Sequence, residues 1–500
     1  MEENKMKSKN LLCLLMALLL TLPLASCGST GTTETTGSDN AVVNEETAVE
    51  TEPDILAGIT YAGADFHIMT SNTDISSNYL LEGSGELTGD IVNDAVFERN
   101  MAAEEQLDIH FTYTQTERKW DAVYSGVTQL VLSGDDTFDL IVDDQLGMST
   151  ASIDKVFVDV AALPTVDLEE GCWSREYMYN LSIDYKSVYL MVGDYFMDVL
   201  NHSHALLYNR DMYNNLYGDP DALYQTVQEG KWTYDQWIAL SEGAYQDLNG
   251  DGKLDADDTF GMIVGGIGGS SFPFTYGSDV PFVSRDASGY PTLTMYCDRL
   301  LLLYDKIYSM FYGAGTYTKY TENGTDLHQK FMAEGALFIS GTQLGDFGVF
   351  RDMEAEVGII PYPKLDESQA NYVTVVHDTA EVGAIPISAR DHEMSGAVSH
   401  LLCRLTHETV LPAYYEMSLK IKYARDNYTS AMIDLIHDGI MDMFCLVYGA
   451  SYANNIFTWA ILEPLQKGTD AVTSAYESRK DAAEQALVGL AETFSGGQSR

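Results

Sequence analysis

The 500-residue sequence carries a large excess of acidic side chains, with 75 Asp and Glu against 28 Lys and Arg, for a formal net charge of −47. Such a charge repels nucleic acids and anionic lipid surfaces, so nucleic-acid binding is excluded. Hydrophobic residues make up 45% of the chain, which is enough for a large packed body, and the length favours two domains over one.

The first residues have the layout of a secretory signal. Three lysines precede an unbroken apolar run at 11–20, and a break containing Pro23 follows soon after it. The run is too short to span a bilayer, which takes roughly 20 apolar residues. We therefore interpret residues 1–26 as a signal peptide. Translation could start at Met1 or at Met6, because the lysines after Met6 are a sufficient basic region.

The segment Leu24-Ala25-Ser26-Cys27 resembles the lipobox of bacterial lipoproteins. The resemblance implies cleavage before Cys27 and alkylation of its thiol by diacylglycerol, which carries fatty-acyl chains such as palmitate. The alternative is an ordinary cleaved signal followed by a free cysteine, which would be a reactive exposed thiol. Residues 27–54 have almost no large apolar side chains, so we expect a flexible tether. The expected location is the outer face of the cell membrane, or the periplasm.

Hydrophobic periodicity predicts the elements of the body in chain order. They are a strand at 66–69, helices at 92–107 and 123–131, strands at 138–142, 188–192 and 206–208, a helix at 300–311, strands at 336–339 and 357–360, and a helical tail at 470–490. The order of strand, helix and strand predicts an α/β fold with parallel pairing. In such folds the polar loops at the carboxyl ends of the strands bind ligands.

Six segments in this order resemble the extracellular solute-binding lipoproteins of bacterial ABC importers, in particular the sugar-binding type. They are NDAVFERN at 93–100, GDDTFDL at 134–140, LLYNRD at 206–211, GKWTYD at 230–235, GIIPYPK at 358–364 and KYARD at 422–426. The resemblance covers nearly the whole mature chain.

The resemblance implies a two-lobed fold like that of the type II periplasmic binding proteins, with the ligand in the cleft between the lobes. Lobe one would contain residues 55–190 and 376–410, and lobe two residues 191–375 and 411–495. A monomer that closes around a solute and delivers it to the permease subunits of a transporter is the implied function, with no catalytic residues.

A calcium loop is predicted at 247–258 from the residues alone. Oxygen donors alternate along it, and Gly252 occupies the sixth position, where an EF-hand loop turns sharply. The predicted ligands are Asp247, Asn249, Asp251, the backbone carbonyl of Lys253, Asp255 and Asp258. Asp258 stands where glutamate is usual, which shortens the reach of the last ligand. The alternative is a solvated acidic turn.

For the solute site we expect polar and aromatic side chains at strand ends, because carboxylates and amides bond sugar hydroxyls while an aromatic ring covers a C–H face. The candidates are Asp143, Asp144, Gln145, Asp194, Tyr195, Gln343, Asp378 and Trp459. For each of them, a solvated loop residue or a packed core aromatic is the alternative interpretation.

Two smaller patterns complete the set of candidate sites. His202 and His204 would share one face of a strand, but no third ligand lies near them in the sequence, so we interpret them as structural rather than as a metal site. Four cysteines remain after Cys27, with no zinc-like spacing, and are expected to be buried free thiols, although one disulfide is compatible with the sequence.

The leading functional hypothesis is therefore a lipoprotein that captures a mono- or oligosaccharide for an ABC importer. A cell-surface glycoside hydrolase is the alternative from another class, since acidic residues are plentiful enough for a catalytic carboxylate pair. A surface sensing protein on the same scaffold is a third hypothesis. The missing repeat pattern of a β/α barrel argues against the hydrolase.

Overall fold

The computed structural model describes residues 54–71, 78–117, 120–253, 255, 257–264, 271–313, 315–318, 324–420, 427–441, 443–451 and 455–496. The predicted signal peptide, the lipid site at Cys27, nearly all of the tether and the segment 422–426 lie outside these ranges. The body that begins at Asp54 forms one compact unit. None of the helices in the described ranges is long and apolar enough to cross a membrane.

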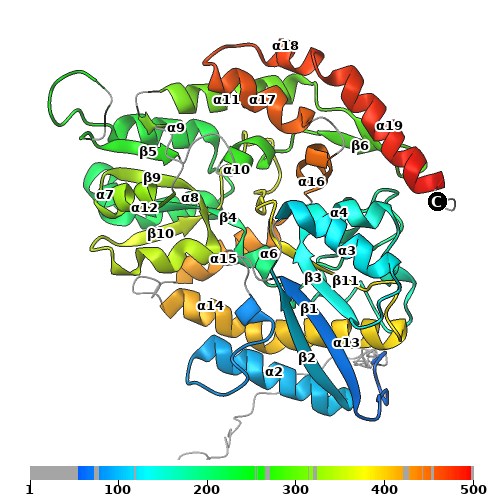
Figure 1. Cartoon of the computed structure of the whole chain (residues 1–500). Helices are drawn as coiled ribbons and strands as arrows, with labels where there is room; N and C mark the ends of the chain where they lie inside the picture. Colours follow the sequence, from blue (N-terminus) through cyan, green and yellow to red (C-terminus); the bar gives the residue numbers. More distant parts are fainter. Residues whose placement is uncertain are drawn as a thin grey trace, which may run out of the picture. The chain divides into compact units, whose positions relative to one another are not determined.

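The first sheet has four strands in the order β11, β3, β1, β2 (Figure 1). Their bounds are β1 Ala64–Ser71, β2 Ile109–Thr116, β3 Leu140–Asp144 and β11 Glu381–Ala384. β1 is parallel to β2 and to β3, and β11 is antiparallel to β3. β3 is buried along its whole length, so its composition is continuously apolar until its two final aspartates.

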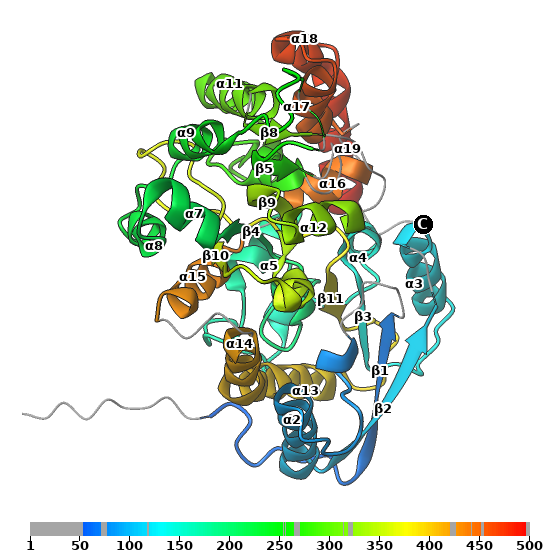
Figure 2. The same ribbon diagram turned by 90° about the vertical axis from the view of Figure 1, so that its left-hand side faces the viewer.

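Helices cover both faces of this sheet, with α2 (Ile91–Leu107) and α13 (His392–Leu405) on one face and α3 (Val123–Leu132) and α4 (Gln145–Ile153) on the other (Figures 1 and 2). α2 begins at Asp90, whose side chain accepts hydrogen bonds from the backbone of Val92 and Asn93. Its buried residues recur at helical spacing, so the periodicity of the sequence reports the face that packs on the sheet.

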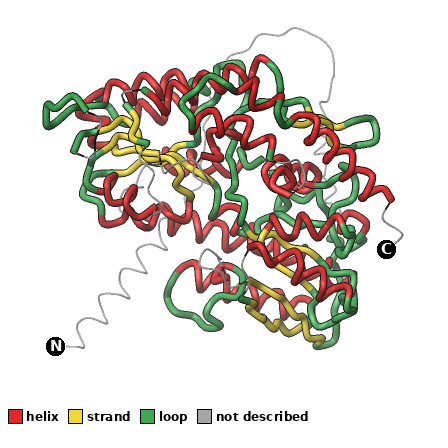
Figure 3. The backbone as a smooth tube through the Cα atoms, turned by 45° about the horizontal axis from the view of Figure 1, so that its top comes forward, coloured by secondary structure: helices red, strands yellow, loops and turns green. Residues whose placement is uncertain are grey.

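The second sheet has five strands in the order β10, β4, β9, β5, β8. Their bounds are β4 His204–Asn209, β5 Phe260–Val264, β8 Thr316–Tyr317, β9 Ala336–Gln343 and β10 Val357–Ile360. β5 is parallel to β8 and β9, whereas β4 is antiparallel to both β9 and β10. Figure 3 shows the strands of the two sheets as two separate groups.

An aromatic cluster fills the core beside the second sheet. Trp237, on α9 (Tyr234–Ala244), stacks on Phe274 with ring centroids 5.5 Å apart and meets Phe338 and Tyr362 edge to face. Trp232 is also fully buried, and its indole N–H donates to the Pro361 carbonyl. Both tryptophans therefore pack in the core.

The remaining elements connect or flank the two sheets. They are α5 Arg175–Leu181, α6 Asp198–Asn201, α7 Arg210–Tyr217, α8 Asp221–Gln228, α10 Phe272–Tyr276, β6 Val283–Arg285, β7 Pro291–Leu293, α11 Asp298–Tyr312, α12 Gly324–Met332, α14 Leu411–Lys420, α15 Asn427–Asp438, α16 Phe444–Ser451, α17 Ile456–Gln466, α18 Val472–Glu477 and α19 Lys480–Gly496, with 3-10 turns at Asn78–Leu80, Trp120–Ala122, Val160–Ala162 and Leu344–Asp352 and a π-helical turn at Thr406–Val410.

Most predicted elements are present, and the parallel pairing of the first sheet is confirmed. The predicted strand at 188–192 is wrong. That run is buried, but it makes only single bridges, such as Met191 with Gly383, where the chain leaves the first sheet. An apolar run reports burial and cannot show whether a neighbouring strand is available to pair with it. The lobe boundaries at 190, 375 and 410 stay predictions.

We predict that Gly261→Ala strongly destabilises the fold. A Cβ atom at Gly261 would lie 1.9 Å from the backbone oxygen of Ser241, where α9 packs on β5. Overpacking against backbone costs about 3 kcal/mol. Gly489→Ala is the matched control, because that position in α19 is open and should gain roughly 0.5–1 kcal/mol. Equal denaturation midpoints for the two variants would contradict this packing.

Candidate functional site at the junction of the two sheets

The two sheets meet where the end of β3 and the start of β4 contact the same segment, residues 375–381. The Gln145 N–H donates to the Ala380 carbonyl, and the side-chain amide of Gln145 donates to the His377 carbonyl at 2.8 Å. On the other side the His377 N–H donates to the His202 carbonyl. We call this region the junction.

Asp144 is the most perturbed carboxyl group of the junction. It ends β3 and caps α4, accepting the Leu146 N–H at 2.8 Å. Only 5% of the residue is exposed. Burial, together with the neighbouring Asp378 and Asp143, raises the pKa of Asp144 to about 8. Asp144 is therefore a carboxyl group held largely neutral near pH 7, able to donate as well as accept a hydrogen bond.

Asp378 and His377 lie beside it on the segment that leads into β11. The Nδ1 atom of His377 is 3.1 Å from Asp378 Oδ1. Burial raises the pKa of Asp378 and lowers the pKa of His377, so burial favours the neutral form of each. A carboxyl group and an imidazole in this state can exchange donor and acceptor roles with a hydroxyl-bearing ligand.

Gln343 and Asp143 also belong to the junction. Gln343 ends β9 directly opposite His204, and its side chain takes part in a reciprocal cap with Asp346. Asp143 pairs with Val382 of β11 and is fully buried. The structure therefore brings together five of the eight predicted residues: Asp143, Asp144, Gln145, Gln343 and Asp378.

Two aromatic residues of the junction were not predicted. The ring of Phe272 lies 6.2 Å from the ring of His377, and the Tyr276 hydroxyl is 2.7 Å from the Thr458 hydroxyl. Both aromatics lie on the short helix α10, which follows β5. Burial and, to a smaller degree, Asp378 raise the pKa of Tyr276. Phe272 and Tyr276 follow the end of a buried strand, and this position in the sequence could have identified them as candidates.

Asp194 and Tyr195 lie in a different cluster. Asp194 is nearly buried and contacts His407 Nδ1 at 2.6 Å and His437 Nε2 at 3.7 Å. Tyr195 is fully buried, and the Arg99 guanidinium lies 4.8 Å from its ring centroid. The structure thus does not bring these two predicted residues to the junction.

Trp459 also points elsewhere. It is 37% exposed and lines an open pocket of about 490 Å³ with Asn455, Ser478 and Arg479. Its neighbour Thr458 is the residue that contacts Tyr276. Trp459 is therefore one helical position away from the junction, and its pocket is a separate surface feature.

The predicted calcium loop lies between α9 and β5. The Asp247 carboxylate accepts the N–H groups of Gly250 and Gly252, and both glycines have positive φ, as the sharp turn requires. Asp258 is buried and accepts the Leu248 N–H, whereas Asp251 pairs with the Lys253 ammonium at 2.8 Å. The loop therefore has the tight turn and the oxygen donors that Ca²⁺ requires.

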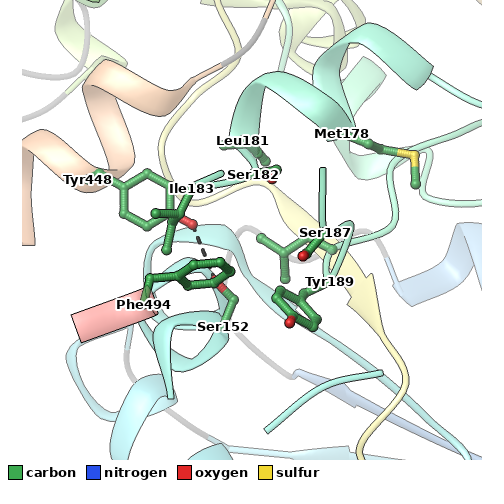
Figure 4. A pocket seen from close by; sticks show the side chains of 10 residues that line it. Ser152, Met178, Leu181, Ser182, Ile183, Ser187, Tyr189, Tyr448 and Phe494 are labelled. Carbon is green, nitrogen blue, oxygen red and sulfur yellow. Dashed lines mark hydrogen bonds between the residues drawn. The ribbon is translucent and has the colours of Figure 1, made fainter. Parts of the chain in front are cut away.

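The small cavity in Figure 4 is not a solute site. It encloses about 10 Å³ beneath the end of α19, and Phe494, Tyr448 and Ser152 are among its lining residues. The Ser152 and Tyr448 hydroxyls are 3.2 Å apart and satisfy each other. A space of this size holds about one water molecule.

One compact group has the composition of a metal site but the wrong hydrogen-bond pattern. Glu170, Cys172 and His400 have potential ligand atoms within 4.8 Å of one another. The Trp173 indole N–H donates to His400 Nδ1 at 2.9 Å, so Nε2 must carry the ring proton, which faces Glu170 at 2.8 Å. Burial also raises the pKa of the Cys172 thiol to about 12. We interpret the group as a structural hydrogen-bond relay.

We predict that Asp144→Asn stabilises the protein increasingly as the pH rises. Below the unfolded pKa of about 4 the wild-type carboxyl group is neutral in both states. Between about pH 4 and pH 8 the unfolded chain loses this proton and the folded protein keeps it, so wild-type stability falls with rising pH. The melting-temperature advantage of Asp144→Asn should grow from pH 5 to pH 8 and then level off.

Asp94→Asn is the control for this experiment. Hydrogen bonds from the Thr88 backbone and neighbouring groups lower the pKa of the exposed Asp94. That stabilisation is present above the unfolded pKa and is lost as the pH falls through the folded pKa. The stability that Asp94 contributes therefore rises with pH, whereas that of Asp144 falls. A difference between Asp144→Asn and wild type that stays constant from pH 5 to pH 9 would contradict a buried neutral carboxyl group.

No protein-family model and no curated protein sequence matches this chain. Solved structures do match it. An ABC transporter solute-binding protein from Thermotoga lettingae, bound with α-D-tagatose, has a TM-score of 0.50 at 12% identity and covers 86% of this chain and 100% of its own. A cyclo/maltodextrin-binding protein complexed with maltotetraose has a TM-score of 0.52 at 12% identity, with coverages of 87% and 97%. The chain therefore has the α/β fold of ABC transporter solute-binding proteins.

Proposed function

We propose that this protein is the substrate-binding lipoprotein of an ABC importer and captures an extracellular mono- or oligosaccharide. The observation that carries the proposal is the junction, where Asp144 and Asp378 lie close enough to perturb each other, Phe272 lies beside His377, and Tyr276 is close enough to Asp378 to feel its charge. Carboxyl groups bond the hydroxyls of a sugar and rings cover its C–H faces. Residues from both sheets contribute, so a solute bound here would favour the conformation in which both contact it.

The structural neighbours support a carbohydrate. The two neighbours with the same fold are described as bound to tagatose and to maltotetraose, a monosaccharide and an oligosaccharide. Both are binding proteins by name, which favours capture over catalysis.

The predicted lipid on Cys27 gives the proposal its location. A tether at 27–54 would keep the body near the permease subunits at the membrane, and tethering raises the effective concentration of two partners without a strong interface. A monomeric body is sufficient for this role, because one chain contains both sheets and the junction between them.

The test is calorimetry of the full chain in detergent against a panel of mono- and oligosaccharides, with chromatography of the sugars afterwards. We expect saturable binding of at least one sugar with no change in the sugar. Asp144→Asn should weaken that binding at least tenfold, because the amide oxygen keeps the cap of α4 and the second carboxyl oxygen, which can donate and accept, is replaced by an NH2 group that can only donate.

Asp139→Asn is the matched control. Asp139 is a buried aspartate at the other end of β3, where its carboxylate accepts the His67 N–H. The Asp139→Asn variant should bind the sugar like wild type. Newly formed reducing ends would support the glycoside hydrolase instead, and equal affinities for the two variants would remove Asp144 from the site.

We also propose a structural Ca²⁺ in the loop 247–258. The donor set fits the ion: Asp247, Asn249 and Asp251 offer side-chain oxygens around the turn at Gly252, and Lys253 would offer its backbone carbonyl. An exposed loop that links α9 to β5 would be ordered by the bound ion. Extracellular calcium fills even weak sites, with Kd of roughly 10⁻⁴ to 10⁻³ M.

Removal of calcium with a chelator should lower the melting temperature, and addition of Ca²⁺ should restore it. Asp247→Asn should lose most of this response. Asp257→Asn, an exposed aspartate of the same loop outside the predicted ligand set, should keep it. If the two variants respond equally to Ca²⁺, the ion does not bind in this loop.

A further inference from the structure

Three histidines share one face of the junction, although the sequence shows only two of them together. Ser203 forms an antiparallel bridge with Val376, so His202 lies directly opposite His377. The pairing is fixed by two backbone hydrogen bonds, from the His377 N–H to the His202 carbonyl at 3.0 Å and from the His204 N–H to the Val375 carbonyl at 2.9 Å. His202 is the C-terminal cap of α6, with φ −94° and ψ 12°, and His204 begins β4, so the distances between the rings, rather than strand alternation, show that the side chains are neighbours.

The rings are neighbours in space. The centroid of the His377 ring is 5.9 Å from that of His204 and 6.4 Å from that of His202. The sequence analysis interpreted His202 and His204 as structural because a third ligand was missing. His377 supplies that third imidazole, although it lies 175 residues after His202 in the sequence.

His204 is the most unusual member. It is 1% exposed, and neither ring nitrogen has a hydrogen-bond partner of ordinary geometry. An unsatisfied buried polar group costs roughly 1–3 kcal/mol and calls for an explanation such as a bound ion.

His202 is oriented as a metal ligand. Its Nδ1 lies 3.0 Å from Asp198 Oδ1 and 3.1 Å from the Asp198 carbonyl. Both of these oxygens can only accept, so Nδ1 carries the ring proton and Nε2 is left for an ion. The second oxygen of Asp198 accepts the Glu381 N–H at 2.8 Å, which fixes the carboxylate. A carboxylate behind an imidazole is the arrangement that orients histidine ligands.

His377 has a different set of partners. Its Nδ1 faces Asp378 Oδ1 at 3.1 Å and the Thr379 hydroxyl at 2.9 Å, and it accepts the Thr379 N–H at 3.3 Å. Nδ1 is therefore the nitrogen with the lone pair, and Nε2 carries the ring proton in this structure. His377 would bind an ion through Nδ1, after a side-chain rotation that releases these partners.

We propose that His202, His204 and His377 bind one divalent transition-metal ion of the Zn²⁺ class. Three imidazoles suit Zn²⁺ and its neighbours in the first transition row, whereas Ca²⁺ prefers oxygen. Three protein ligands leave one coordination position open, beside Asp378 and Phe272. The site is separate from the calcium loop and does not depend on the identity of the solute.

Ion binding requires side-chain rotation on a backbone that is already paired. Among the described residues only Glu170, Cys172 and His400 have their ligand atoms within 4.8 Å of one another, so the three rings have not closed to coordination distance. The ion would link the start of β4 to the segment that leads into β11. It would therefore cross-link the two sheets at the point where the solute is proposed to bind.

The test uses the full chain, stripped with EDTA and titrated with Co²⁺ as a coloured substitute for Zn²⁺. We expect one equivalent of Co²⁺ with the visible absorption of a nitrogen-rich site, displaced by Zn²⁺ and not by Ca²⁺. His204→Leu should lose these bands while the metal-free variant still folds, because neither ring nitrogen of His204 has a hydrogen-bond partner of ordinary geometry. His377→Gln should also lose them, and Asp198→Asn should weaken binding by about 10- to 100-fold.

Two controls separate this site from other histidines. His400→Gln removes the compact group that we assign to a relay, and His407→Gln removes an exposed histidine beside Asp194. Both should bind Co²⁺ like wild type. Bands that survive in His204→Leu, bands that vanish in His400→Gln, or a wild-type protein that takes up no Co²⁺ would each overturn the proposal. Sugar binding is measured separately in EDTA, so its failure would be distinguishable.

Discussion

The short backbone pairing between residues 202–204 and 375–377 is the constraint on which the junction depends. One segment enters the second sheet as β4, and the other leads into β11 of the first sheet. Their bridge at Ser203 and Val376 ties the two sheets together where strand ends from both converge. His377 and Asp378 take their positions from this pairing and from the contact of Gln145 with the same segment, whereas Asp143 and Asp144 are positioned by the pairing of β3 with β11.

The electrostatic character of the junction follows from burial. The carboxyl group of Asp144 is nearly fully buried and the Asp378 side chain is 22% exposed, and neither forms an ion pair with a lysine or arginine in the described part of the chain. Burial therefore favours the neutral acids of Asp144 and Asp378 and the neutral imidazole of His377, whereas Asp198 raises the pKa of His202. Such groups can both donate and accept, which suits a ligand rich in hydroxyls. They also make the region sensitive to a cation, since an ion can replace the ring protons.

The solute and metal proposals use different atoms of one region. The solute is proposed to meet Asp144, Asp378, Phe272 and Tyr276, and the ion is proposed to meet ring nitrogens of the three histidines. Asp378 lies between the two sets, in contact with His377 Nδ1. A metal ion could therefore alter how Asp378 presents its oxygens to a sugar without entering the sugar's own contacts.

The sequence by itself determined whatever depends on neighbours along the chain. Helical periodicity located α2 and α11, and the polar ends of buried strands identified Asp144 and Asp378 as site candidates. The turn with Gly252 is likewise local, since one twelve-residue segment supplies all its donors. Such features are set by residues a few positions apart, so a pattern in the sequence is sufficient to find them.

The tertiary structure alone decided which distant residues meet. It placed Asp194 with His407 and His437 instead of at the junction, turned Trp459 toward Arg479, and left 188–192 without a strand partner. It also brought His377 opposite His202. The reason is that a side chain's chemistry is visible in the sequence, whereas its partners depend on strand order and crossovers, which local periodicity does not encode.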